Sequence, residues 1–228
     1  MSEWWTYRPE DILLFSPRVY WRMFELHNAA LWPLHVLTLG AGLIIILLIA
    51  RRSGIGARWI AFILAMLWIF VGWSFLWNRY ATINWAAAYV APAFAVEGVF
   101  LLVIGSLRGG LAFDRRGPAG WIGYLILGFA LAGQPLLAPL QARGWASSEV
   151  FGIAPDPTAM ATLGVLLLAR GKLLPVLLPI PVLWCLLSAM TLSTMGEPQA
   201  WPPYAALALA AAAWTWTIIR RRGSPPPA

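Results

Sequence analysis

The chain has 228 residues, of which 61% are hydrophobic and 11% are charged, and its formal net charge is +7. Because soluble domains carry about a quarter charged residues, this composition excludes a soluble globular protein and indicates a single helical domain in a membrane. The basic residues lie mainly between apolar runs, where membrane topology explains them, so we expect the lipid bilayer as a partner and no nucleic acid.

Residues 1–30 alternate aromatic and charged side chains and contain no early apolar run, which argues against a cleavable signal peptide. Within this segment, Ser16 followed by Pro17 has the pattern of a helix N-cap and a first helical residue. We therefore predict an N-terminal amphipathic helix that lies in the membrane interface on the periplasmic side.

Seven apolar runs follow, and we predict about seven transmembrane helices, of which the fifth falls short of a full span. Together they make one transmembrane domain over residues 31–219, followed by a basic, proline-rich cytoplasmic tail at residues 220–228. The runs lie at about residues 31–50, 59–77, 85–107, 120–140, 157–169, 173–195 and 203–219.

The Lys and Arg residues are distributed unevenly between the two sides that these helices define. Eleven fall on one side: Arg51, Arg52, Arg58, Arg108, Arg115, Arg116, Arg170, Lys172, Arg220, Arg221 and Arg222. Five fall on the other: Arg8, Arg18, Arg22, Arg79 and Arg143. Since cytoplasmic loops carry the excess of basic residues, we predict that the N-terminus is outside and the C-terminus is in the cytoplasm.

The fifth run is too short to cross a bilayer. Asp156 stands between two prolines, and we expect it to cap a helix that begins at Pro157. The thirteen apolar residues from Pro157 to Ala169 would extend roughly 20 Å, against about 30 Å of hydrocarbon. The capped end should therefore lie below the membrane surface, at the floor of an outward-facing cavity lined by residues 150–155.

Two other runs carry residues that shape helix packing. The sixth contains Pro175, Pro179 and Pro181, and we expect it to be bent or locally unwound because a proline inside a helix removes a backbone hydrogen bond. Gly123 and Gly128 in the fourth run predict close approach of neighbouring helices.

Glu97 is the acidic residue that lies well inside a predicted span. A carboxylate at that depth costs at least a few kcal/mol unless it is paired, protonated or in contact with water. Glu97 is therefore either a functional residue or a protonated side chain that hydrogen-bonds across a helix interface.

Polar side chains are also predicted near the outer ends of the helices. With Asp156 and Glu97 they are candidates for contact with a ligand or ion: Asn28, Asn84, Gln134, Glu149 and Thr158. The alternative is that they form hydrogen bonds between helices.

The two histidines, His27 and His35, are eight residues apart, about two helical turns, and would share one face. Together with Asp156 or Glu149 they could ligate a divalent metal such as zinc or copper. The spacing does not demand a metal, and the alternative is that both histidines form hydrogen bonds at the interface.

The motifs of common catalytic sites do not occur in this sequence. It has no phosphate-binding glycine loop, no Ser-x-x-Lys, no His-Glu-x-x-His and no nucleophile elbow. Its one cysteine, Cys185, excludes an intramolecular disulfide and a cysteine-cluster metal site. We therefore expect no cofactor, and an enzyme would need a bound metal.

Four groups of residues form a pattern: Phe24, Asn28, Trp32 and Pro33; Tyr80, Ile83, Asn84 and Ala86; Phe151, Gly152, Pro155, Pro157, Thr158, Leu163 and Gly164; and Pro181, Leu183 and Trp184. In these residues the chain resembles a bacterial family of multi-pass membrane proteins known as domain of unknown function 6064. The resemblance implies a helical protein of the bacterial inner membrane and supplies no activity. Members often carry cysteine at the position of Asp156, so the resemblance implies no soft-metal thiolate here, although a carboxylate fits a harder cation.

Two functional hypotheses follow. In the first, the helices bind or pass a small solute or ion through the outward-facing cavity, with Asp156 at its floor and Glu97 below. In the second, the chain is an accessory subunit of a larger complex, and its N-terminal helix and small-residue faces contact other membrane subunits.

Overall fold

The computed structural model describes residues 15–113 and 117–223. Over these two ranges the chain is helical, and its only β pairings are two isolated bridges. The predicted all-α class is therefore confirmed. The predictions for residues 1–14 and for the end of the tail, 224–228, concern residues outside the described ranges.

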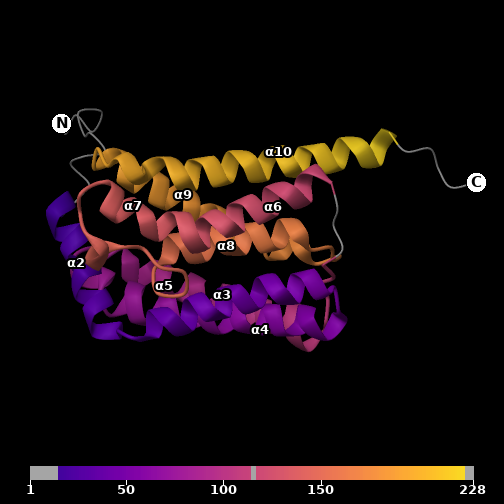
Figure 1. Ribbon diagram of the computed structural model, residues 1–228, viewed down its shortest axis with the longest axis horizontal. Coiled ribbons are helices and arrows are strands. Elements are labelled where there is room, and N and C mark those ends of the chain that lie inside the picture. The colour runs from indigo at the N-terminus through magenta and orange to yellow at the C-terminus, as the bar shows by residue number, and fades with distance from the viewer. Residues whose placement is uncertain (1–14, 114–116, 224–228) are drawn as a thin grey trace, which may run out of the picture.

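The long helices run side by side along the longest axis of the molecule, and α2 lies across one end of them (Figure 1). The segments 72–77, 101–107 and 129–133 are π-helical and continue α4, α5 and α6 without a break. The α-helices are α2 (Pro17–Leu31), α3 (Leu34–Arg51), α4 (Gly54–Val71), α5 (Ala87–Phe100), α6 (Pro118–Gly128), α7 (Gln134–Leu140), α8 (Pro155–Leu168), α9 (Pro179–Thr194) and α10 (Trp201–Gly223).

Five helical segments of the described chain are long and apolar enough to cross a membrane: Leu34–Arg51, Gly54–Thr82, Ala87–Leu107, Pro118–Leu140 and Leu174–Thr194. The large side chains of α3 point outward, with Leu37, Leu43 and Leu47 each more than half exposed. Such a surface is what a lipid environment requires, because water would penalise so much exposed apolar area.

The predicted start of the first helix is confirmed. Ser16 is the N-cap of α2, its hydroxyl accepts a hydrogen bond from the Val19 N–H at 3.4 Å, and Pro17 is the first helical residue. A turn at Trp32 and Pro33 then separates α2 from α3. The histidines His27 and His35 therefore lie on two different helices, and the assumption that they share one helix face was wrong.

Helix α8 is the centre of the fold, and all 14 of its residues are buried. It is as short as the sequence predicts, but it begins at Pro155, and the N-cap position is occupied by Ala154. The prediction that Asp156 caps this helix was therefore wrong. The N-terminal end of α8 is also covered by protein, since Asp156 is only 1% exposed, so it does not form the floor of an open cavity.

Helices α6 and α8 approach each other closely at two glycines. A Cβ atom added at Gly123 would lie 2.8 Å from the carbonyl oxygen of Gly164, and one added at Gly164 would lie 2.7 Å from the carbonyl oxygen of Gly123. The two backbones touch because neither residue has a side chain, which confirms the close packing predicted at Gly123. A Cβ atom added at Gly128 meets nothing within 4 Å, so the close approach predicted there was wrong.

The prolines of the sixth run do not kink a helix. Pro175 lies in a short 3₁₀ turn, and Pro179 and Pro181 lie in the first turn of α9. First-turn N–H groups have no partner within the helix, so proline is tolerated there. The chain is locally unwound before α9, as expected, but the prolines begin the helix and do not bend it.

Candidate functional site

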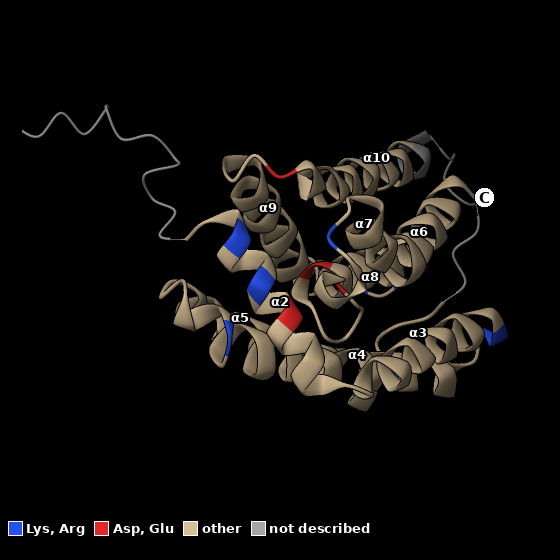
Figure 2. Ribbon diagram, turned by 60° about the vertical axis from the view of Figure 1, so that its left-hand side comes forward, with Lys and Arg blue, Asp and Glu red and all other residues tan. Residues whose placement is uncertain are grey.

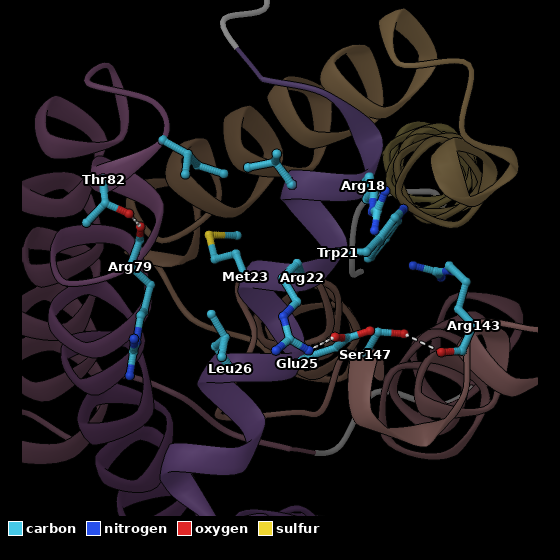
Figure 3. Close-up of a pocket in the computed structure, with 12 residues that line it drawn as sticks. Arg18, Trp21, Arg22, Met23, Glu25, Leu26, Arg79, Thr82, Arg143 and Ser147 are labelled. Atoms are coloured by element: carbon cyan, nitrogen blue, oxygen red, sulfur yellow. Dashed lines mark hydrogen bonds and ion pairs between the residues drawn. The ribbon is translucent and has the colours of Figure 1, made fainter.

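A pocket of about 770 Å³ opens at the end of the molecule where α2 crosses the bundle (Figure 3). Three segments that are far apart in the sequence form its walls: α2, the 79–83 turn after α4, and the loop that follows α7. We call it the arginine pocket, and it is lined by Arg18, Val19, Trp21, Arg22, Met23, Glu25, Leu26, Arg79, Thr82, Ile83, Arg143 and Ser147.

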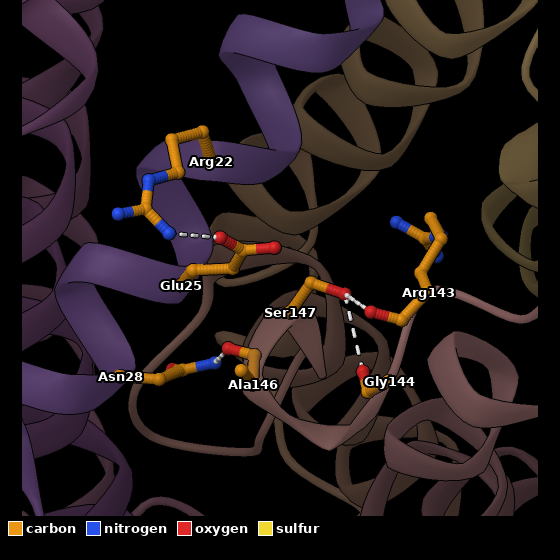
Figure 4. A network of polar contacts seen from close by, with 7 residues as sticks. All are labelled: Arg22, Glu25, Asn28, Arg143, Gly144, Ala146 and Ser147. Carbon is orange, nitrogen blue, oxygen red and sulfur yellow. Dashed lines mark hydrogen bonds and ion pairs between the residues drawn. The ribbon is translucent and has the colours of Figure 1, made fainter.

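Charged residues gather at this pocket, whereas the bodies of the long helices are largely uncharged (Figure 2). Four arginines line it against one glutamate, Glu25. Glu25 forms a 2.5 Å ion pair with Arg22 on the surface of α2 (Figure 4). The pocket therefore keeps an excess of positive charge after this pairing.

Arg143 and Trp21 lie against each other at one side of the pocket (Figure 3). The guanidinium carbon of Arg143 lies 3.4 Å from the centre of the Trp21 ring, in the geometry of a cation–π contact. Nε and Nη1 of Arg143 and Nε1 of Trp21 are all buried and have no hydrogen-bond acceptor among the described residues. Three N–H donor groups of this stacked pair are thus left unpaired.

The loop that carries Arg143 is held by hydrogen bonds (Figure 4). The side-chain amide of Asn28 donates to the carbonyl oxygens of Ala146 and Ser148, each at 2.8 Å. The Ser147 hydroxyl donates to the carbonyl oxygens of Arg143 and Gly144 at 3.3 and 3.2 Å. Asn28 thus ties α2 to this loop and fixes two walls of the pocket relative to each other.

Glu149 and Gln134 form a buried pair behind this loop. The Gln134 amide donates to Oε2 of Glu149 at 2.9 Å, while Oε1 of each side chain has no partner in the described chain. Burial, followed by the charge of Asp156, raises the pKa of Glu149 to about 8, although Arg143 and the Gln134 hydrogen bond oppose the shift. Glu149 is therefore mostly protonated at neutral pH.

Because its pKa is raised in the folded chain, Glu149 should make the free energy of unfolding depend on pH. Between the ordinary pKa of 4.5 and the folded value of about 8, the folded chain keeps a proton that the unfolded chain releases. The free energy of unfolding should therefore fall as pH rises through this window. We expect Glu149→Gln to flatten the dependence of the thermal unfolding midpoint on pH, measured in nanodiscs. Equal slopes in wild type and variant would show that Glu149 ionises normally.

Asp156 accepts two hydrogen bonds from α9. Oδ1 accepts from Nε1 of Trp184 at 2.8 Å, and Oδ2 accepts from the Ser188 hydroxyl at 2.5 Å. Trp184 and Ser188 also line a small cavity of about 60 Å³, to which Asn84 contributes. Asp156 therefore joins α8 to α9, and it does not line the arginine pocket.

Thr158 closes the turn that enters α8. Its hydroxyl donates to the carbonyl oxygen of Ala154 at 2.7 Å and accepts from the Gly152 N–H at 2.9 Å. Gly152 has a φ of +74°, a conformation that favours glycine. This contact is structural, and the ligand role predicted for Thr158 stays a prediction.

The remaining predicted residues lie apart from the pocket. Glu97 is fully buried in α5, and both of its carboxyl oxygens lack a partner among the described residues. Asn84 accepts a hydrogen bond from the Ala86 N–H at 3.1 Å, which begins the turn into α5.

The two histidines are not assembled with carboxylates. Nε2 of His35 lies 3.1 Å from Oδ1 of Asn28, and the His27 ring packs edge-on against Phe75. Burial lowers the pKa of His27 to about 4, so the ring is neutral. No group of three His, Cys, Asp or Glu side chains placed to hold a metal occurs in residues 15–113 and 117–223.

The sequence-based reasoning missed the residues that form the pocket: Arg18, Trp21, Arg22, Arg79 and Arg143. The four arginines were counted only as charges on the less basic side. A signal was present, because all four arginines fell on the same side of the predicted topology.

Comparison with known proteins identifies the family and no activity. The model of the family described as "Family of unknown function (DUF6064)" matches residues 17–222, which is most of the chain. No curated protein and no solved structure matches the chain. The resemblance seen in the sequence is thereby confirmed, and the chain belongs to the DUF6064 family.

Proposed function

We propose that the chain is a protein of the bacterial inner membrane that binds a small solute in the arginine pocket, on the periplasmic side. In this arrangement the N-terminus is outside and the C-terminus is cytoplasmic. The short α8 and the long α10 join the five membrane-length helices as sixth and seventh spans, and α2 lies in the interface.

The main support for this proposal is that three segments far apart in the sequence line one pocket. Its volume of about 770 Å³ falls within the roughly 300–1,000 Å³ typical of small-molecule sites. Asn28 holds two of its walls together. Charged guanidinium groups and apolar side chains such as Met23 and Leu26 line it together, which suits an amphiphilic or polar solute.

The proposal concerns binding and does not include passage across the membrane. Asp156 and Glu97, the residues expected along a path, are 1% and 0% exposed. Neither lines the arginine pocket. The exposed apolar side chains of α3 suit lipid, so they do not by themselves favour the role of an accessory subunit.

The proposal can be tested by ligand-induced stabilisation of the purified full-length chain in nanodiscs. Glucose and glycine serve as neutral probes, choline and putrescine as cationic ones, and succinate and inorganic phosphate as anionic ones. A bound probe at about 100 times its Kd should stabilise the chain by roughly 2.7 kcal/mol, seen as a higher unfolding midpoint.

A pocket-filling variant gives the control. The double substitution Leu26→Trp with Thr82→Trp adds two bulky side chains to the pocket lining and should abolish the shift. The matched substitution Leu37→Trp, on the exposed face of α3, should leave the shift unchanged. A shift that survives in the double variant, or no shift with any class of probe, would refute the proposal.

A further inference from the structure

The stacked pair of Arg143 and Trp21 on the wall of the arginine pocket lacks a hydrogen-bond acceptor. Nε and Nη1 of Arg143 and Nε1 of Trp21 are buried without partners in the described chain. Leaving a buried donor unpaired destabilises the fold, and the cost is higher for a charged group. Folded proteins rarely keep such groups unpaired, so three of them in one stacked pair point to an acceptor that the described residues do not supply.

The charge around this pair defines the acceptor further. Arg18, Arg22 and Arg79 line the same pocket, and Glu25 compensates one of these charges through its ion pair with Arg22. Glu197 lies outside this lining and its charge also acts on Arg143, although the two form no ion pair among the described residues. A cation would be repelled by the pocket lining, and a neutral ligand would leave the excess positive charge of the lining uncompensated. An anion satisfies both the charge and the open donors.

The nearest acidic side chain of the loop does not fill this role. Glu149 is buried, and its Oε2 already accepts a hydrogen bond from Gln134. Burial also raises the pKa of Glu149 to about 8, so at neutral pH it brings little negative charge to Arg143. The third nitrogen of the Arg143 guanidinium, Nη2, donates to Oε1 of Gln141 at 3.4 Å, which is a long and weak hydrogen bond.

We propose that the arginine pocket binds an oxyanion, a carboxylate or phosphate group, which accepts hydrogen bonds from the Arg143 guanidinium and from Nε1 of Trp21. The inference rests on the proposed function and names the class of ligand. A guanidinium presents parallel N–H groups that match two oxygens of a carboxylate or phosphate. The Trp21 ring holds the guanidinium plane in place, so little side-chain freedom is lost on binding.

The test is the dissociation constant of succinate and of inorganic phosphate, measured by titration calorimetry on the full-length chain in phosphatidylcholine nanodiscs. Arg143→Gln should weaken binding about 10- to 100-fold, since a hydrogen bond to a charged group contributes about 1.5–3 kcal/mol. Trp21→Phe keeps the aromatic face and removes one neutral donor, so it should weaken binding about 2- to 10-fold.

Two further variants separate a specific site from general charge attraction. Glu25→Gln removes the negative charge that pairs with Arg22 and should tighten binding. Arg51→Gln removes the same charge as Arg143→Gln, but at the far end of α3, and should leave the dissociation constant unchanged. An equal loss in Arg51→Gln and Arg143→Gln would overturn the inference.

The oxyanion has two sources, a soluble molecule or a lipid headgroup, and the membrane composition distinguishes them. If the source is soluble, succinate or phosphate binds in phosphatidylcholine nanodiscs. If it is a headgroup, phosphatidylglycerol nanodiscs raise the unfolding midpoint of the wild type, and Arg143→Gln abolishes this rise. Either result supports an oxyanion site, and the absence of both overturns it.

The inference and the proposed function can fail separately. If glucose or glycine binds, and the pocket-filling variant abolishes that binding while Arg143→Gln does not, the pocket binds a solute that is not an oxyanion. If no probe binds, and the unfolding midpoint is the same in phosphatidylcholine and phosphatidylglycerol nanodiscs, both proposals fail.

Discussion

Replacing Gly164 with alanine is expected to destabilise the fold by about 1–3 kcal/mol or more, because the added methyl group has nowhere to go. It would lie 2.7 Å from the carbonyl oxygen of Gly123 and 2.8 Å from the backbone nitrogen of Leu127. Backbone atoms cannot rotate away as a side chain can, so α6 and α8 would have to separate. The unfolding midpoint in nanodiscs measures the effect.

Gly128→Ala is the matched control on the other helix of this pair. A Cβ atom added at Gly128 meets nothing within 4 Å, so the same substitution there introduces no clash. It should stabilise the helix by roughly 0.5–1 kcal/mol, since alanine loses less backbone freedom than glycine on folding. Equal effects of Gly164→Ala and Gly128→Ala would contradict the close approach of α6 and α8.

The second large effect is expected from Asp156→Leu. This change leaves Nε1 of Trp184 and the Ser188 hydroxyl without their acceptor in a buried site. At about 1–3 kcal/mol for each unpaired donor, the loss should reach several kcal/mol, and Asp156→Asn should cost less because the amide oxygen still accepts a hydrogen bond. Unfolding midpoints of both variants give the comparison.

Substituting the two residues that donate hydrogen bonds to Asp156, Trp184 and Ser188, provides the control. Adding Trp184→Phe and Ser188→Ala to Asp156→Leu removes the unpaired groups together with the carboxylate. Because replacing both partners of a hydrogen bond by apolar groups is often nearly neutral, the triple variant should be more stable than Asp156→Leu alone. A triple variant that is less stable would show that Asp156 contributes through something other than these two hydrogen bonds.

Local features of the sequence predicted local features of the structure. Ser16 and Pro17 set the start of α2, because an N-cap hydroxyl and a proline at the first helical position act within one turn. The apolar runs predicted the helices, and the basic Arg170-Gly-Lys172 segment marked the end of the short α8 within a few residues. Each of these signals depends on neighbours in the chain.

Predictions that depended on the position of distant residues were wrong, and features formed by distant residues were not predicted. Asp156 looked like a helix cap, but its hydrogen-bond partners, Trp184 and Ser188, are 28 and 32 residues away. His27 and His35 were placed on one face because the turn at Trp32 and Pro33 was not anticipated. The pairing of a carboxylate with its donors is decided by which helix packs against which, and a local pattern does not contain that information.

By itself, the sequence determined the helical class, the apolar segments and the shortness of α8, because composition and spacing act over one or two turns. Tertiary structure alone decided where the arginines meet. Arg22, Arg79 and Arg143 are separated by more than fifty residues from one to the next, yet they line one pocket. Side chains so far apart in the chain become neighbours only when burial of apolar surface and close backbone contacts, such as that between Gly123 and Gly164, fix the helices against one another.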